Sequence, residues 1–199
     1  MREIPQGFVD YVFKERRNLV MRMLEGKITK EEMLIGFTRH TPAVISYGPA
    51  GLNASIKGVG LVIKKEYLNE VTRILKDKLK EEISMREALR ILLDLVYRED
   101  RIDFTKLSSI ELAKKHTWTN IQQNPEVTLL FYTPPNVSYE VRCKASIHLN
   151  DSYWEFVNAV HDIFHGGKMT RDWSKYPVYI FKIVEVYDNS PSSMGIRIY

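Results

Sequence analysis

Two neighbouring apolar segments constrain the fold of this chain more than any other part of its sequence. Residues 127–132 are densely apolar and follow an Asn124-Pro125 turn, a pattern typical of a buried strand. After a second turn, apolar and polar residues alternate strictly over residues 139–148. Strict alternation indicates a strand with one buried face and one solvated face.

Four further segments have strand character, which brings the expected number of strands to six. They are residues 43–47, 53–63, 101–105 and 178–187. The connections are mostly short, and this favours an antiparallel barrel or sandwich over a parallel sheet. Gly58 and Gly60 lie inside the second of these segments, where they indicate a sheet corner or the close approach of a ligand.

The other long segments are expected to be helical. An amphipathic pattern over residues 8–25 belongs to an N-terminal helical segment, residues 1–40. Two apolar stripes predict a helical hairpin inserted at residues 65–97. Ser108 and Glu111 have the spacing of a capping box, which predicts a helix that begins there. The whole chain, residues 1–199, is expected to form one α+β domain.

Composition narrows the functional classes. The chain has 29 Lys and Arg against 25 Asp and Glu, a formal net charge of +4. This mild basicity favours an anionic partner such as a phosphate group, a nucleotide or nucleic acid, although a charge-mixed surface explains it equally well. Cys143 is the only cysteine, so the chain has no intrachain disulfide. No membrane span or secretion signal is apparent, and a cytoplasmic protein is expected.

Other motifs point away from hydrolases and NTPases, because the chain has neither a Gly-x-Ser-x-Gly elbow nor a phosphate-binding P-loop. His161 and His165 lie four residues apart and could chelate a metal. Two partly exposed histidines on a helix are the simpler interpretation, and no metal site is predicted.

Residues 114–120 form the segment that is richest in possible ligand contacts. It combines two lysines, two threonine hydroxyls and an asparagine amide, which are donors that can hold a phosphate monoester. Thr105 and Lys106 precede it and could converge on the same anion if strand and helix pack side by side. An exposed helix surface is the alternative.

Several motifs together resemble a known family. They are Ile102-Asp103-Phe104-Thr105, Asn120-Ile121, the run from Asn124 to Phe131, and Cys143-Lys144-Ala145. In this order they are similar to the split-barrel flavoproteins of the pyridoxamine 5'-phosphate oxidase type. The resemblance implies a six-stranded antiparallel split β-barrel, a homodimer, and FMN in a groove between the subunits. It also implies flavin-dependent oxidation or reduction of a small molecule.

The resemblance also implies which residues contact the cofactor. The phosphate contacts carried over by position are Thr105, Lys115, Thr117 and Asn120. The ring contacts carried over are Ser55, Ile56, Lys57 and Gly58. Two positions depart from the family pattern, because Thr117 stands where a Lys or Arg is usual and Lys115 stands where a Ser is usual. No catalytic residue is predicted.

Three alternatives to an FMN oxidoreductase stay open at this point. The cofactor could be a deazaflavin. The chain could be a nucleic-acid-binding or regulatory module, given its basic N-terminal helix. It could also be a split-barrel dimer that has lost its flavin.

Overall fold

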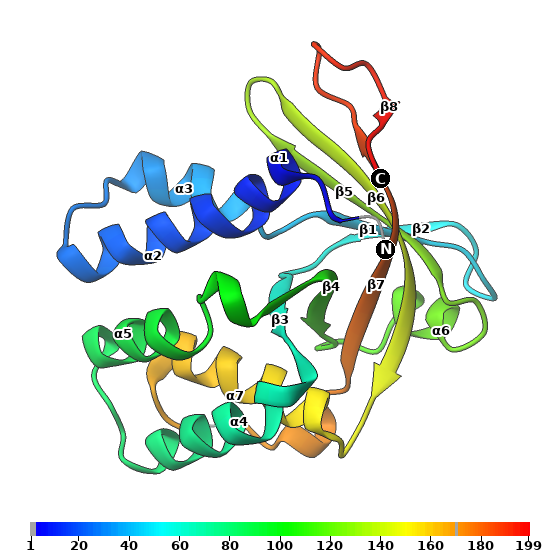
Figure 1. Cartoon of the computed structure of the whole chain (residues 1–199). Coiled ribbons are helices and arrows are strands. Elements are labelled where there is room, and N and C mark those ends of the chain that lie inside the picture. Colours follow the sequence, from blue (N-terminus) through cyan, green and yellow to red (C-terminus); the bar gives the residue numbers. More distant parts are fainter. Residues whose placement is uncertain (1–2, 170) are drawn as a thin grey trace.

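The computed structural model describes residues 3–169 and 171–199, in which the strands form one antiparallel sheet (Figure 1). Its strand order is β2-β1-β5-β6-β7-β4-β3, and β8 pairs with β7. The strands are β1 (Ala43–Ser46), β2 (Asn53–Ile56), β3 (Gly60–Ile63), β4 (Ile102–Ile110), β5 (Glu126–Thr133), β6 (Val137–His148), β7 (Val178–Asp188) and β8 (Ile196–Arg197).

A bend between β2 and β3 closes this sheet into a split barrel. The two strands lie at opposite edges of the sheet, and only residues 57–59 separate them in the chain. Within the bend, Lys57 N donates to Pro42 O at 3.2 Å and Val59 N donates to His40 O at 2.8 Å. These bonds extend the β1–β2 pairing through the bend to the residues before β1. Beyond the bend, β3 pairs with β4 instead.

The expected split barrel is therefore present, with a different strand count. The strand predicted over residues 53–63 is divided in two by the bend, and the short strand β8 was not predicted. Gly60 lies at the start of β3, and a Cβ atom there would approach the Ser108 Oγ of β4 to 3.0 Å. Close packing of two strands at the corner explains this glycine.

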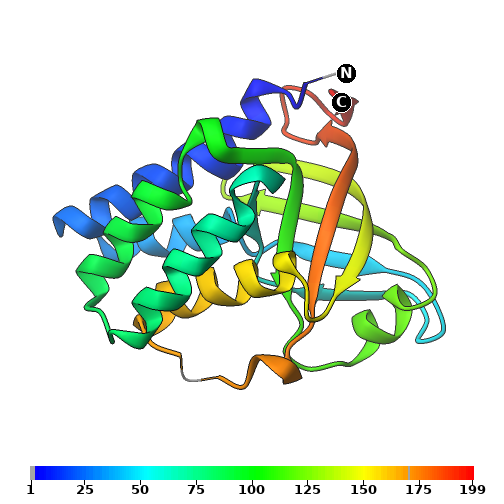
Figure 2. The same ribbon diagram turned by 60° about the horizontal axis from the view of Figure 1, so that its bottom comes forward.

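The helices gather on one side of the barrel, except for α6 (Figures 1 and 2). They are α1 (Gln6–Val9), α2 (Glu15–Glu25), α3 (Lys30–Thr38), α4 (Lys65–Lys80), α5 (Met85–Leu95), α6 (His116–Ile121) and α7 (Ser152–Gly166). A π-helical segment, Asp10–Lys14, joins α1 to α2. The predicted helical hairpin is present as α4 and α5, and both of its helices pack against α7.

The core runs from the barrel interior into the helical layer. Val44, Leu129, Val141 and Val186 pair across β1, β5, β6 and β7, and each is fully buried. The apolar stripe of α4 is likewise fully buried against its neighbours, for example at Leu75. None of the helices in the described residues has the length and apolar character needed to cross a lipid bilayer.

The segment that follows residue 105 differs from the prediction. Strand β4 continues to Ile110 and pairs with β7 through Ser108 and Ser109. The predicted capping box of Ser108 and Glu111 is therefore wrong, since Ser108 lies within a strand and the next helix, α6, begins at His116. Pairing with a strand on each side outweighs the local capping pattern.

Candidate functional site

A cavity of about 420 Å³ lies where the bent strand meets the helices, and we call it the bend cavity. Its walls come from residues 58–61 of the bend and β3, from residues 108–110 of β4, and from α7. The apolar side chains in these walls include Phe37, Val59, Leu112, Phe156, Val160 and Phe164. Pockets of this size and apolar lining are typical of sites for small molecules and cofactors.

Two buried polar atoms of this cavity lack a partner. Within residues 3–169 and 171–199, neither the Ser109 hydroxyl nor the His40 Nδ1 forms a hydrogen bond, although both residues line the cavity. An unpartnered buried polar group costs on the order of 1–3 kcal/mol, and native structures usually satisfy it with protein, water or ligand. These two atoms therefore mark where a bound molecule could be held.

Basic side chains complete the polar part of the cavity. Arg16 donates to Val59 O at 2.7 Å, which fixes a guanidinium beside the bend. Burial, together with the charge of Arg16, lowers the pKa of His40 to about 3, so its imidazole is neutral at pH 7. Burial and the neighbouring His161 also lower the pKa of His165. The rings of these last two histidines lie 4.4 Å apart on α7.

No group of three or more His, Cys, Asp or Glu side chains in the described part of the chain is arranged to hold a metal ion.

A second polar cluster adjoins the bend cavity, and we call it the Glu111 cluster. The carboxylate of Glu111 accepts hydrogen bonds from Lys57 Nζ and Tyr179 Oη, each at 2.8 Å. Its other oxygen accepts from the backbone N–H groups of Ala113 and Lys114, each at 2.7 Å. Burial alone would raise the pKa of Glu111, but these donors hold it below its usual range. Glu111 is therefore ionised while it is almost completely buried.

The predicted site residues on α6 are engaged within the protein. The Thr117 hydroxyl lies 2.9 Å from Ser55 Oγ and accepts from Asn53 Nδ2 at 2.8 Å. Asn120 is fully buried; its Oδ1 accepts from Ala50 N, and its Nδ2 donates to Gly51 O, both at 2.8 Å. The structure thus brings Ser55 and Thr117 together, and it uses Asn120 to fasten the turn between β1 and β2.

The remaining predicted residues are spread over different surroundings. Thr105 lies in the middle of β4, and its hydroxyl donates to Asp103 Oδ1 at 2.5 Å. Lys115 is exposed at the residue before α6, and Ile56 is exposed on the outer face of β2. Lys57 belongs to the Glu111 cluster, and Gly58 lines the bend cavity. No hydrogen bond in the described residues links Thr105 to Thr117 or Lys115.

Sequence reasoning missed Glu111, Ser109 and His40 as site residues. Glu111 was assigned to a helix cap, and Ser109 to the helix that this cap would open. His40 precedes β1 without any motif around it. A longer strand assignment for residues 102–110 would have placed Ser109 beside β7, but nothing in the sequence pairs Glu111 with Lys57 and Tyr179.

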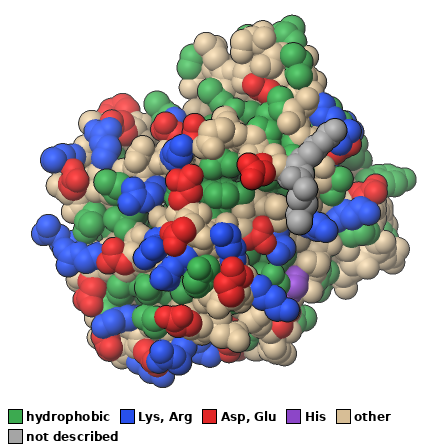
Figure 3. Space-filling model, viewed as in Figure 1, with side chains coloured by type: hydrophobic (Ala, Val, Ile, Leu, Met, Phe, Trp, Pro, Cys, Tyr) green, Lys and Arg blue, Asp and Glu red, His purple; other side chains and the backbone are tan. Residues whose placement is uncertain are grey.

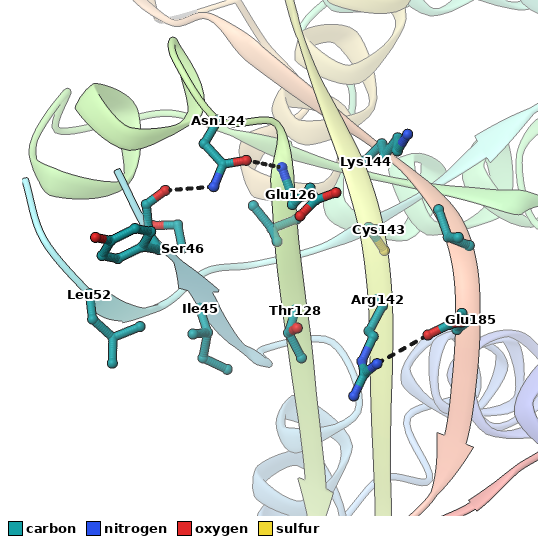
Figure 4. A pocket seen from close by; sticks show the side chains of 13 residues that line it. Ile45, Ser46, Leu52, Asn124, Glu126, Thr128, Arg142, Cys143, Lys144 and Glu185 are labelled. Carbon is teal, nitrogen blue, oxygen red and sulfur yellow. Dashed lines mark hydrogen bonds and ion pairs between the residues drawn. The ribbon is translucent and has the colours of Figure 1, made fainter. Parts of the chain in front are cut away.

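A depression of about 550 Å³ occupies the outer face of the barrel (Figure 4). Ile45 of β1, Thr128 of β5 and Arg142 of β6 lie across its floor. Arg142 forms ion pairs with Glu140 at 2.8 Å and Glu185 at 3.2 Å. Glu126 and Lys144 also line this open depression, so that it carries more charged side chains than the bend cavity.

Comparison with known proteins identifies the fold. No protein-family model matches the sequence, and no curated protein matches it either. Among solved structures, HupZ of Group A Streptococcus shares 14% identity with a TM-score of 0.50, and the match covers 86% of this chain and 99% of that chain. The chain has the split-barrel fold of pyridoxamine 5'-phosphate oxidase-like proteins.

Two other structures show weaker overall similarity. An FMN-binding protein related to pyridoxamine 5'-phosphate oxidase from Nostoc punctiforme shares 13% identity with a TM-score of 0.45, and the match covers 94% of this chain and 86% of that chain. An F420 reductase shares 14% identity with a TM-score of 0.44, and the match covers 74% of this chain and 88% of that chain.

Proposed function

We propose that this protein binds a flavin-type ring in the bend cavity and uses it to oxidise or reduce a small molecule. The observation that carries the proposal is an apolar cavity with two buried polar atoms, Ser109 Oγ and His40 Nδ1, that have no partner in the described residues. FMN is the form that the family resemblance implies, and a deazaflavin is the alternative. A flavin supplies hydride or electron transfer when it is bound.

The ring part of such a cofactor suits the cavity. A fused aromatic ring has apolar faces and a polar edge, and the walls offer phenylalanine side chains together with a few polar atoms. Ser109 Oγ and His40 Nδ1 would hold the polar edge. Arg16, fixed by its bond to Val59 O, would place a positive charge near the ring. Phe156 and Phe164 of α7 would exclude water.

The phosphate part of FMN does not suit the donors predicted for it. Of the predicted phosphate contacts, Thr105, Thr117 and Asn120 are already hydrogen-bonded within the protein. The remaining predicted phosphate contact, Lys115, is an exposed cation. This difference between the ring and the phosphate supports a flavin ring without a phosphate group as the better candidate for the bend cavity.

A homodimer is part of the proposal. On the outer face of β2, β1 and β5, Ile56 lies beside Ala43, which in turn lies beside Leu130. Ile56 is 70% exposed and Leu130 is 39% exposed, while Leu52 near the same edge is 77% exposed. Clustered exposed apolar side chains of this kind mark interfaces, and a second copy of the chain is the partner that the fold resemblance implies.

The nucleic-acid alternative gains no support from the face drawn in Figure 3. Lys and Arg side chains are interspersed there with Asp and Glu, and they form no continuous basic stripe. Several of the basic residues also form ion pairs, for example Lys76 with Glu155 at 2.7 Å.

Flavin binding is tested by the visible absorption spectrum of the purified protein and by fluorescence titration with lumiflavin, riboflavin and FMN. The variant Val160→Trp fills the bend cavity and is expected to weaken ring binding by at least about tenfold. Val184→Trp is the matched control, since Val184 is 44% exposed on the outer face of β7, and it is expected to bind like the parent. Absence of binding to all three rings, or unchanged binding by Val160→Trp, would refute the proposal.

A further inference from the structure

Four donors from three separate parts of the chain converge on one carboxylate. Lys57 comes from the bend, Tyr179 from β7, and the N–H groups of Ala113 and Lys114 from the loop after β4. All four donor–acceptor distances lie between 2.7 and 2.8 Å. An ammonium, a phenol and two adjacent backbone amides form the donor set of an anion-binding site, and here the anion is Glu111 itself.

The carboxylate at the centre of this arrangement is shielded from water. Glu111 is 1% exposed, and Tyr179 is fully buried. Lys57 Nζ also lies 5.7 Å from the centre of the Tyr179 ring, so the cation contacts both the carboxylate and an aromatic face. Neither Lys57 nor Glu111 could be removed without leaving the other as an uncompensated charge, which is strongly unfavourable in a buried site.

The Glu111 cluster shares its backbone with the bend cavity. Ile110 and Leu112, the neighbours of Glu111, both line the cavity, and so does Gly58, the neighbour of Lys57. The ammonium of Lys57, whose neighbour Gly58 lines the cavity, is thus paired with Glu111 and is not available to neutralise the phosphate group of a ligand.

We propose that Glu111 is a built-in anion that fills this anion-binding site and makes the bend cavity selective for a ring ligand without a phosphate group. The selectivity for a ring ligand rests on the proposed function. The role of Glu111 as an internal anion does not, because it concerns only the four donors and the carboxylate that they hold. Two experiments test these two parts separately.

The first experiment empties the site and offers it an external anion. In Glu111→Ala the donors remain and the carboxylate is gone, so the melting temperature is expected to fall. Sodium acetate or inorganic phosphate is expected to raise it again in proportion to the logarithm of concentration, and chloride at the same ionic strength is not. The parent protein and Glu126→Ala, which removes an exposed carboxylate from β5, are expected to show no such specific rescue.

A second variant keeps this experiment decisive. Glu111→Gln removes the charge but fills the site, so it is expected to be destabilised without rescue by acetate. If Glu111→Ala does not fold in buffer alone, recovery of its helical circular dichroism on adding acetate is the expected result. Failure of every anion to stabilise Glu111→Ala, or equal rescue of Glu111→Gln, overturns the inference.

The second experiment compares ligands by fluorescence titration. The parent is expected to bind riboflavin or lumiflavin at least about tenfold more tightly than FMN, and Glu111→Ala is expected to reduce that ratio. Equal affinity of the parent for riboflavin and FMN overturns the selectivity while leaving the proposed function intact. Absence of binding to every ring refutes the proposed function, and the anion rescue then still reports on the Glu111 cluster.

Discussion

Two glycines near the candidate site differ in how closely the surrounding atoms pack against them. Gly48 lies in the turn after β1, where a Cβ atom would come within 2.9 Å of the Asn120 Cα. Gly58, by contrast, has open space around its Cβ position and no positive φ. The two glycines, which lie before and after β2, therefore have different reasons to be there, since Gly48 is required by packing and Gly58 is not.

The substitution Gly48→Ala is expected to lower the free energy of unfolding by about 1–3 kcal/mol, because the added methyl group overlaps backbone that has little room to move. Gly58→Ala is the matched control and is expected to stay within about 0.5 kcal/mol of the parent. Urea unfolding followed by circular dichroism measures both. Equal destabilisation of the two variants would contradict the packing explanation.

His40 makes the stability of the protein depend on pH. Its pKa falls from the usual 6.5 to about 3 in the folded state, because burial and the charge of Arg16 disfavour the imidazolium. The contribution of the neutral imidazole is therefore fully present above pH 6.5. It is lost progressively as the pH falls toward 3, since the unfolded chain then binds a proton that the folded chain does not.

Replacing His40 with Leu is expected to flatten the dependence of stability on pH between 6.5 and 3. In the parent this residue contributes a slope of at most about 1.4 kcal/mol for each pH unit. Urea unfolding at a series of pH values measures the slope, and His116→Leu, at an exposed position, is the control. An unchanged slope in His40→Leu would show that the imidazole is charged or solvated in the folded state.

At the scale of helices and strands, some parts of the fold could be predicted from the sequence and others could not. The helical hairpin followed from two apolar stripes, and the buried strands 127–132 and 139–148 followed from their hydrophobic patterns, because those patterns record the face that each element buries. The bend between β2 and β3 could be predicted from the sequence only in part. Gly58 and Gly60 indicated a corner, but pairing with residues before β1 depends on partners far away in the chain.

The element that was misassigned explains why the site was harder to predict than the fold. Ser108 and Glu111 have capping spacing, yet residues 108–110 are held in a strand by pairing with β7. Glu111 then meets Lys57 and Tyr179, which lie 54 and 68 positions away in the sequence. A local pattern contains no information about contacts of that separation. Whether Ser55, Lys115 or Thr117 contacts a cofactor stays a prediction.

On the scale of the whole molecule, the barrel has two differently covered faces. The helical layer of α2, α4, α5 and α7 covers one side (Figure 2). Within this layer, α2 and α7 contribute residues to the wall of the bend cavity. The outer face of β2, β1 and β5 carries the exposed side chains Ile56 and Leu130, and Leu52 is exposed next to β2. The proposed dimer would bury these apolar side chains between two copies of the chain.

The substitution Leu130→Arg is expected to convert a dimer to a monomer, because it places a charge in the centre of that apolar face. Leu34→Arg on α3 is the matched control, since Leu34 is 69% exposed on the helical side. Sedimentation equilibrium of the parent and both variants measures the mass. A parent protein that sediments as a monomer, or a Leu130→Arg variant that remains dimeric, would contradict this assignment of the interface.

The Glu111 cluster has a consequence for how the protein is made in the cell. A site of four converging donors that had to be filled from outside would tie completion of folding to the supply of a soluble anion. Here the counter-charge is encoded in the polypeptide and arrives with every newly synthesised copy. The four donors are therefore satisfied within the chain itself, and completing this part of the barrel requires no soluble anion.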